Sequence, residues 1–406
     1  MPASLEGWQS YPLAWRADLF YTPLIPIRSL YKRMTLHLNF TTDLIIRDRL
    51  DRWDAAARET SLEPGNWRML VVWPAARDAS VSGSTGIEGN PLDAEQVEQV
   101  LAGSAVQADA THIREVENYN RALNLARAAA QRPDFGWSHD FIHLINATVM
   151  EGLPRDTRGN YRSSPEDEIH VGIFTGPSPL LVQRLMDALI GWLRSDGTSP
   201  LIRAALIHLN LIAIHPFSDG NGRTSRVLAA VELIRDGVRA PELISIEAYL
   251  RRNRDEYVDI LRTTLGPSYD PENHPVTEWI DYYTRISLDR LSARTRIIDA
   301  LPTDIGMLFS ALEDAGQPLE WAPTLLAARV GRLRTAQLAD LTGRSMPAAR
   351  AELARIARAG WLEPHGMTRG RWYAPAESLN AIPLRVPDLM RHLARGDQLA
   401  MFDRET

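Results

Sequence analysis

Apolar residues recur at helical spacing along most of the chain, whereas strand-like alternation is confined to short stretches. The apolar run at 67–72 fits either a helix or a strand, and residues 1–40, rich in Pro, Trp and Tyr, are expected to form an extended arm against the body. The sequence therefore predicts a mainly α-helical fold. The predicted helices cover residues 41–60, 75–82, 93–101, 113–131, 138–150, 180–193, 201–213, 227–234, 244–257 and about 276–300.

Residues 333–374 have a different order of elements. Two helices joined by a turn at 342–345 precede a strand from residue 360 and a return strand ending near 373, and this order resembles a winged helix-turn-helix. The basic excess of the segment suits contacts with DNA phosphates, and the alternative is a module for dimerisation or target docking. Its acidic residues are Asp340, Glu352 and Glu363. They are outnumbered by the arginines expected on its surface, which are Arg344, Arg350, Arg355, Arg358, Arg369 and Arg371.

Composition narrows the class of protein. The chain has 406 residues, which is room for two or three domains, and its net charge of −6 argues against a general attraction to nucleic acid or membranes. It has no cysteine, so disulfides, thiolate nucleophiles and Cys-zinc sites are excluded, and a cytoplasmic location is expected. No secretory signal is expected, and the most apolar window, 201–214, is too short to span a bilayer.

A polar cluster at 215–226 lies between two apolar helical segments. Gly220 and Gly222 permit positive φ and close approach of a ligand, and the free amides at the next helix start suit an anion. Arg223 and Arg226 are three residues apart, so they share a helix face and can hold neighbouring phosphates. The loop is therefore predicted to bind phosphate groups.

Two further side chains of the cluster add chemistry. Asp219 is a plausible ligand for Mg²⁺, which prefers carboxylate, phosphate and water oxygens. His215 titrates near neutral pH and is a candidate general base. A base, a metal ligand and an anion clamp together favour an active site over a solvated turn.

The segment His215-Pro-Phe-Ser-Asp-Gly-Asn-Gly-Arg-Thr-Ser-Arg226 resembles the signature loop of the Fic family, H-P-F-x-[DE]-G-N-G-R-x-x-R, without departure. The resemblance implies transfer of AMP from ATP to a Tyr, Ser or Thr hydroxyl of a target protein, which includes the chain itself as a candidate. It implies that His215 is the base, that Asp219 holds Mg²⁺, and that Phe217 faces the core. The implied phosphate contacts are Gly220, Asn221, Gly222, Arg223 for the β-phosphate and Arg226 for the γ-phosphate.

A second segment, Ser84 to Gly89, resembles the inhibitory motif of Fic proteins, [ST]-x-x-x-E-[GN]. By this resemblance Glu88 pairs with Arg226 and occupies the position of the ATP γ-phosphate. A carboxylate is an anion of suitable reach for an arginine. The wild-type chain is therefore expected to be competent but held in a weakly active state.

Other family features are less specific. Arg158 to Arg162 resembles the G-x-[YF]-R segment upstream of the Fic loop, and about 166–175 is expected to form a hairpin flap that positions the target by strand pairing. Asn253 and Tyr257 resemble residues that line the nucleotide base. Alternatively, Asn253 lies on a solvated helix face and Tyr257 is an aromatic residue of the core. His139 and His143 have metal-compatible spacing but no third ligand nearby, so a structural role is favoured.

The expected domains follow from these segments. Residues 1–112 form an N-terminal region with the motif 84–89, 113–265 the catalytic core, 266–310 a linker helix, 311–380 the winged module and 381–406 a tail. The rival functions are removal of AMP with Glu88 activating a water, use of another donor such as phosphocholine, and a DNA-binding regulator whose core senses a nucleotide. A homodimer is a further expectation, and no membrane partner is expected.

Overall fold

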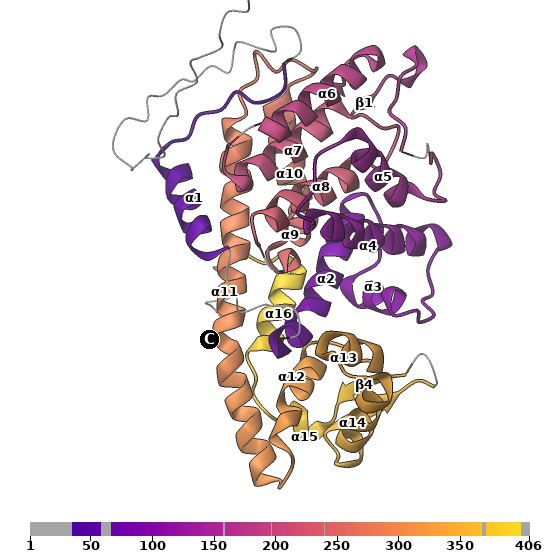
Figure 1. Ribbon diagram of the computed structural model, residues 1–406, viewed down its shortest axis with the longest axis vertical. Coiled ribbons are helices and arrows are strands. Elements are labelled where there is room, and N and C mark those ends of the chain that lie inside the picture. The colour runs from indigo at the N-terminus through magenta and orange to yellow at the C-terminus, as the bar shows by residue number, and fades with distance from the viewer. Residues whose placement is uncertain are drawn as a thin grey trace, which may run out of the picture. The chain divides into compact units, whose positions relative to one another are not determined.

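The computed structural model describes residues 35–57, 66–156, 159–195, 197–238, 240–367 and 371–398. Helices dominate these residues, which confirms the mainly α-helical class (Figure 1). Most of the expected arm at 1–40 lies outside the described residues, as do Arg158 and Arg369. None of the described helices combines the length and the apolar run that a membrane span requires.

The α-helices are α1 (Leu44–Ala56), α2 (Trp67–Ile87), α3 (Ala94–Leu101), α4 (Ala110–Ala130), α5 (His139–Met150), α6 (Pro179–Ser195), α7 (Pro200–Ile214), α8 (Asn221–Arg235), α9 (Glu247–Arg252), α10 (Arg254–Leu265), α11 (Thr277–Asp314), α12 (Ala322–Val330), α13 (Thr335–Thr342), α14 (Met346–Arg358), α15 (Glu377–Asn380) and α16 (Val386–Arg395). Short 3-10 helices cover Pro165–Asp167, Pro241–Ile244 and Leu319–Trp321. Strands β1 (His170–Val171) and β2 (Phe174–Thr175) form one antiparallel hairpin, and β3 (Leu362–His365) and β4 (Trp372–Pro375) form another.

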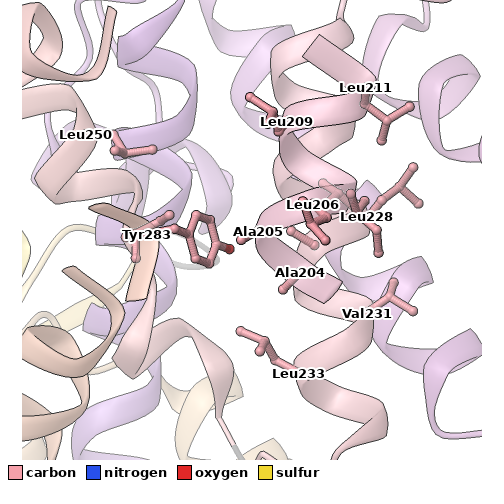
Figure 2. Packing of buried hydrophobic residues seen from close by; sticks show 14 of the residues in the cluster. Ala204, Ala205, Leu206, Leu209, Leu211, Leu228, Val231, Leu233, Leu250 and Tyr283 are labelled. Atoms are coloured by element: carbon pink, nitrogen blue, oxygen red, sulfur yellow. The ribbon is translucent and has the colours of Figure 1, made fainter. Parts of the chain in front are cut away.

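The helix α7 is the centre of the larger hydrophobic cluster. Nearly all its residues are buried, which explains why the segment is apolar on every side. Figure 2 shows Ala204, Ala205 and Leu206 of α7 among Leu228 of α8 and Tyr283 of α11. This packing fixes α7 and α8 firmly, and the polar cluster predicted to bind phosphate comprises the turn between them and the first residues of α8.

Helix α2 is longer than the segment 75–82 predicted for it. It includes the ambiguous run at 67–72 and continues through Pro74 to Ile87. Its first half contributes to a second hydrophobic cluster together with the C-terminal helices, whereas Val81 and Ile87 belong to the cluster around α7. Burial on two sides explains why the sequence showed no clear helical stripe there.

Two further boundaries differ from the prediction. The helix expected over 244–257 is broken at Asn253, whose backbone (φ −109°, ψ 44°) ends α9 and begins α10. Helix α11 continues past Pro302 to Asp314, so the expected boundary at 310 falls inside a helix. Leu301, Leu308 and Leu312 are fully buried, and this packing accounts for the continuation.

The C-terminal segment has the predicted order of elements: α13, a turn at Gly343 in the left-handed region, α14 and the β3–β4 hairpin. Its assignment to the winged-helix class stays a prediction. Arg344, Arg350, Arg355, Arg358 and Arg371 are exposed, as expected. Arg344 pairs with Glu352, which is buried, so this charge is locally balanced.

Candidate active site

The loop begins where α7 ends. His215 adopts the left-handed conformation (φ 49°, ψ 60°), which is uncommon for a residue with a Cβ. Gly220 (φ 77°) precedes the first residue of α8, and a Cβ there would lie 2.8 Å from the sulfur of Met150. The turn therefore needs glycine at this position for both its conformation and its space.

Arg162 holds the other side of this turn. Its guanidinium donates to the carbonyls of His215 (2.7 Å), Ile214 (3.0 Å) and Pro177 (2.7 Å), and its own amide donates to Pro216 (2.8 Å). Burial lowers the pKa of Arg162 to about 10, so the side chain remains charged at pH 7. A cation on the last carbonyls of α7 also complements the helix dipole. The sequence motif identified this segment without indicating its contacts.

Asn221 braces the loop internally. Its Oδ1 accepts from the Phe217 amide (3.0 Å) and its Nδ2 donates to the Phe217 carbonyl (2.8 Å). Phe217 is fully buried, as expected. The Asn221 side chain therefore shapes the loop, and its expected contact with phosphate stays a prediction.

The imidazole of His215 is poised as a neutral base. Its Nδ1 lies 3.3 Å from the carbonyl oxygen of Ile212, a partner that assigns the proton to Nδ1 and leaves Nε2 as the acceptor. Burial lowers the pKa of His215, against a raising effect from the Ile212 carbonyl, and the Arg162 charge lowers it further. The net shift is downward from 6.5.

Arg226 is buried, and its guanidinium donates hydrogen bonds to residues at the end of α2. Its Nε donates to Ser84 Oγ (2.8 Å), and its Nη2 donates to the Ser84 carbonyl (3.0 Å) and to Glu88 Oε1 (2.8 Å). Partial burial raises the pKa of the Glu88 carboxyl, but the charge and hydrogen bond of Arg226 outweigh it, and the net shift is downward. Glu88 is therefore a carboxylate paired with Arg226. The sequence motif included Ser84 but did not indicate that it contacts the arginine.

The Glu88 carboxylate also covers the start of α8. A Cβ added to Gly222 would lie 2.3 Å from Glu88 Oε1. The carboxylate thus occupies the side of the helix N-terminus where an anion is favoured.

Asp219 and Arg223 form the other half of the cluster. Arg223 Nη2 lies 3.5 Å from Asp219 Oδ1, and Arg223 Nη1 lies 3.1 Å from Glu115 Oε1 of α4. Asp219 is 39% exposed, and Asn146 of α5 donates to its backbone carbonyl (3.1 Å). Glu115 and Asn146 could not be predicted from the sequence because they lie far from the motif along the chain.

The side chains present fit a magnesium ion only in part. Among the described residues no group of three or more His, Cys, Asp or Glu is arranged to hold a metal. One accessible carboxylate, that of Asp219, is nevertheless the kind of protein ligand that Mg²⁺ uses when phosphates and water supply its other oxygens. Asp219 would then hold the ion together with the substrate.

Asn253 lies at the break between α9 and α10, whereas Tyr257 of α10 adjoins the Arg226 side chain. Asn253 donates to the Tyr249 carbonyl (3.0 Å) at the break between α9 and α10. Tyr257 is 4% exposed, and its hydroxyl lies 2.9 Å from His208 Nε2 within the aromatic core. The structure thus brings together the predicted residues from His215 to Arg226 with Glu88, and it places Tyr257 beside Arg226. The expected contact of Asn253 and Tyr257 with the nucleotide base stays a prediction.

His139 and His143 have structural contacts. His139 lies 2.9 Å from Asp187 Oδ1 and 3.2 Å from the Tyr161 hydroxyl, and the ring of His143 packs edge-on against Tyr161. This agrees with the structural role favoured from the sequence.

Comparison with known proteins agrees with this geometry. The model of the Fic/DOC family matches residues 136–233. The chain is 31% identical over 263 residues to protein adenylyltransferase Fic of Aedes aegypti (61% of this chain, 50% of that protein) and 30% identical over 216 residues to protein adenylyltransferase fic-1 of Caenorhabditis elegans (51% and 39%). It is 28% identical over 246 residues to a probable protein adenylyltransferase of Aquifex aeolicus (56% and 73%).

The fold also resembles a solved structure. A Fic family protein from Desulfovibrio desulfuricans aligns with a TM-score of 0.52 at 20% identity, covering 84% of this chain and 98% of that one. The chain spans half or less of the length of the two animal relatives. Residues 136–233, which contain the loop from His215 to Arg226, therefore match the model of the Fic/DOC family.

Proposed function

We propose that the protein is a protein adenylyltransferase that moves AMP from ATP to a Tyr, Ser or Thr hydroxyl of a target protein. The observation that carries the proposal is the arrangement of a partly buried neutral base, His215, beside a helix N-terminus whose Arg226 holds a carboxylate at 2.8 Å. An arginine that binds a carboxylate here is suited to a phosphate once the carboxylate leaves. The names of the relatives support the same activity.

The reaction follows from the side chains. His215 Nε2 accepts the proton of the target hydroxyl, and the hydroxyl oxygen attacks the α-phosphorus of ATP. The bond from that phosphorus to the oxygen bridging the α- and β-phosphates breaks, so AMP is joined to the target and pyrophosphate leaves. Asp219 would hold Mg²⁺, which neutralises charge on the phosphates when bound. The amides of Gly220 and Gly222 and the guanidinium groups of Arg223 and Arg226 bind the phosphate oxygens.

Glu88 regulates this site in the proposal. Because Glu88 and the ATP γ-phosphate compete for Arg226, the contact at 2.8 Å supports an inhibited resting state within a single chain. Movement of the end of α2 away from Arg226 would open the site.

The β1–β2 hairpin is the proposed docking point for the target. Val171 and Ile173 at this hairpin are 50% and 67% exposed. An extended target segment could add to the short strands by backbone pairing, which leaves the hydroxyl facing His215.

The identity of the transferred group is testable. The Glu88→Gly variant is incubated with Mg²⁺ and ATP labelled either at the α- or at the γ-phosphate, and label retained by protein is measured. Only the α-label should be retained, because AMP contains the α-phosphate alone. Glu88→Gly combined with His215→Ala should retain almost none. Retention of the γ-label would instead indicate phosphoryl transfer and would end the proposal.

DNA binding by the C-terminal segment is a second candidate. The exposed Arg350, Arg355 and Arg358 on α14 favour it, since these charges are available for phosphates. De-AMPylation through Glu88, homodimerisation and a cytoplasmic location stay predictions.

A further inference from the structure

Glu115, in the interior of α4, joins the candidate site to the loop that follows Glu88. Its Oε1 accepts from Arg223 Nη1 (3.1 Å), and its Oε2 accepts from Asn90 Nδ2 (2.8 Å). The side chains of Glu115 and Arg223 are 18% and 5% exposed. The pair is therefore far better protected from solvent than an ordinary surface ion pair.

Asn90 makes Glu115 a fixed partner. Asn90 is 2% exposed, its Nδ2 also donates to the His112 carbonyl (3.0 Å), and its Oδ1 accepts from the Leu92 amide (3.1 Å). Both ends of the amide are thus engaged with backbone groups. Because Asn90 is anchored in this way, it orients one carboxylate oxygen of Glu115 and directs the other toward Arg223.

Arg223 is held by one end of its guanidinium. Nη1 bonds to Glu115, whereas the contacts of Nη2 with residues that the structure describes are long, at 3.5 Å to Asp219 Oδ1 and to the sulfur of Met150. Its Nε has no hydrogen-bond partner among the described residues. Strong donors therefore remain on the side of Arg223 away from Glu115.

The two arginines of the loop differ in what holds them. Arg226 donates from both Nε and Nη2 to the end of α2, including Glu88, which has to leave before a phosphate binds. Arg223 is instead held by Glu115 of α4, a different helix from the one that carries Glu88. The contact between Glu115 and Arg223 is therefore suited to orienting the arginine during binding and catalysis.

We propose that Glu115 is a positioning residue that aims Arg223 at the second phosphate of the nucleotide. The proposal rests on the proposed function. It makes Glu115 responsible for preference for nucleoside di- and triphosphates over monophosphates, because only the former carry the group that Arg223 contacts. Glu115 itself contacts no substrate in this account.

The competing roles give different results. If Glu115 only stabilised the fold, its loss would weaken binding of every nucleotide alike. If Glu115 competed with phosphate for Arg223, as Glu88 does for Arg226, its loss would strengthen binding of diphosphates. A positioning role requires a loss that depends on the second phosphate.

The test compares ADP with AMP by calorimetric titration with Mg²⁺ in the Glu88→Gly variant, where Arg226 is free. Adding Glu115→Gln removes the charge but keeps the size of the side chain. ADP should then bind about tenfold more weakly, the effect of roughly one charge-assisted hydrogen bond, whereas AMP binding should change less than about twofold. The control is Glu117→Gln, an exposed residue on the same helix, which should leave both affinities unchanged.

A second variant guards against misfolding of the first. Glu115→Asp keeps the charge, but its side chain is too short to bridge Asn90 and Arg223. It should therefore weaken the binding of ADP but not of AMP, and by less than Glu115→Gln does. Equal loss for ADP and AMP, unchanged ADP binding or tighter ADP binding would each overturn the proposal. If the parent Glu88→Gly variant binds neither nucleotide, the proposed function fails, and that failure is seen in the parent rather than in the Glu115 variants.

Discussion

His215 combines an uncommon backbone conformation with a neutral side chain. Its left-handed φ of 49° turns the chain sharply after α7, while Arg162 binds the carbonyl oxygen of the same residue. Strained residues of this kind persist where surrounding contacts determine them, and they are common at active sites. The uncommon backbone conformation thus occurs in the residue that we propose as the base.

The protonation of His215 gives a pH prediction. Burial lowers its pKa, so the imidazole loses its proton at a pH below the ordinary 6.5 and the base form persists into mildly acidic solution. The acidic limb of the rate of self-labelling by Glu88→Gly, measured at saturating ATP, should have its midpoint below 6.5. A midpoint above that value would contradict the neutral-base assignment, and the added substitution His215→Ala should abolish the limb.

At the residue scale the sequence predicted the members of the site better than their contacts. The pairing of Glu88 with Arg226 was expected and is present at 2.8 Å. Glu115 and Asn146 reach the loop from helices that precede it by many residues, and nothing in their local sequence indicates this. Asn221 was expected on phosphate, and the sequence did not indicate that its amide also closes the turn through the Phe217 backbone.

The turn between α7 and α8 is the element on which the site depends. The carbonyls of Ile214 and His215 follow the last helical hydrogen bonds and need donors, since buried acceptors without partners are costly. Arg162 supplies those donors and also binds the Pro177 carbonyl beyond the hairpin. One side chain therefore holds the end of α7 to the segment that carries the flap.

Removal of this side chain should be costly. Arg162→Ala leaves three buried carbonyls without their charged donor, so the free energy of unfolding should fall by about 3 kcal/mol. Urea denaturation followed by circular dichroism measures the change. The exposed Arg184→Ala on α6 is the control, with an expected change within about 0.5 kcal/mol. A loss for Arg162→Ala no larger than in this control would show that the carbonyls find other donors.

At the element scale, regular amphipathic helices such as α5 and α6 were predicted almost to their ends. Prediction was poorer where tertiary packing decides the outcome. Helix α2 includes Pro74 and is buried on two sides, and α11 continues through Pro302 because the leucines beyond it are buried. The break at Asn253 has no glycine or proline to mark it.

At the scale of the whole molecule, α2 connects two hydrophobic clusters. Its residues Leu70, Val71 and Val72 pack with the C-terminal helices, while its other end carries Ser84 and Glu88 to Arg226. Glu88, which pairs with Arg226, thus directly follows a helix that is packed in both clusters. This arrangement could not be derived from the sequence, because each half of α2 has its partners in a different part of the chain.

The central claim concerns one arginine with two competing anions. Arg226 holds Glu88 in the structure, and the account requires the γ-phosphate of ATP to bind there when Glu88 is absent. A charge-assisted contact of this kind contributes about 1.5–3 kcal/mol, which corresponds to a rate effect of about tenfold or more.

The most direct measurement is the rate of self-labelling from α-labelled ATP with Mg²⁺, compared between the wild-type chain and Glu88→Gly. The account predicts that the variant labels itself at least about ten times faster, with a matched thermal midpoint of unfolding. A variant that labels no faster than the wild-type chain would contradict the claim that Glu88 holds this site inactive.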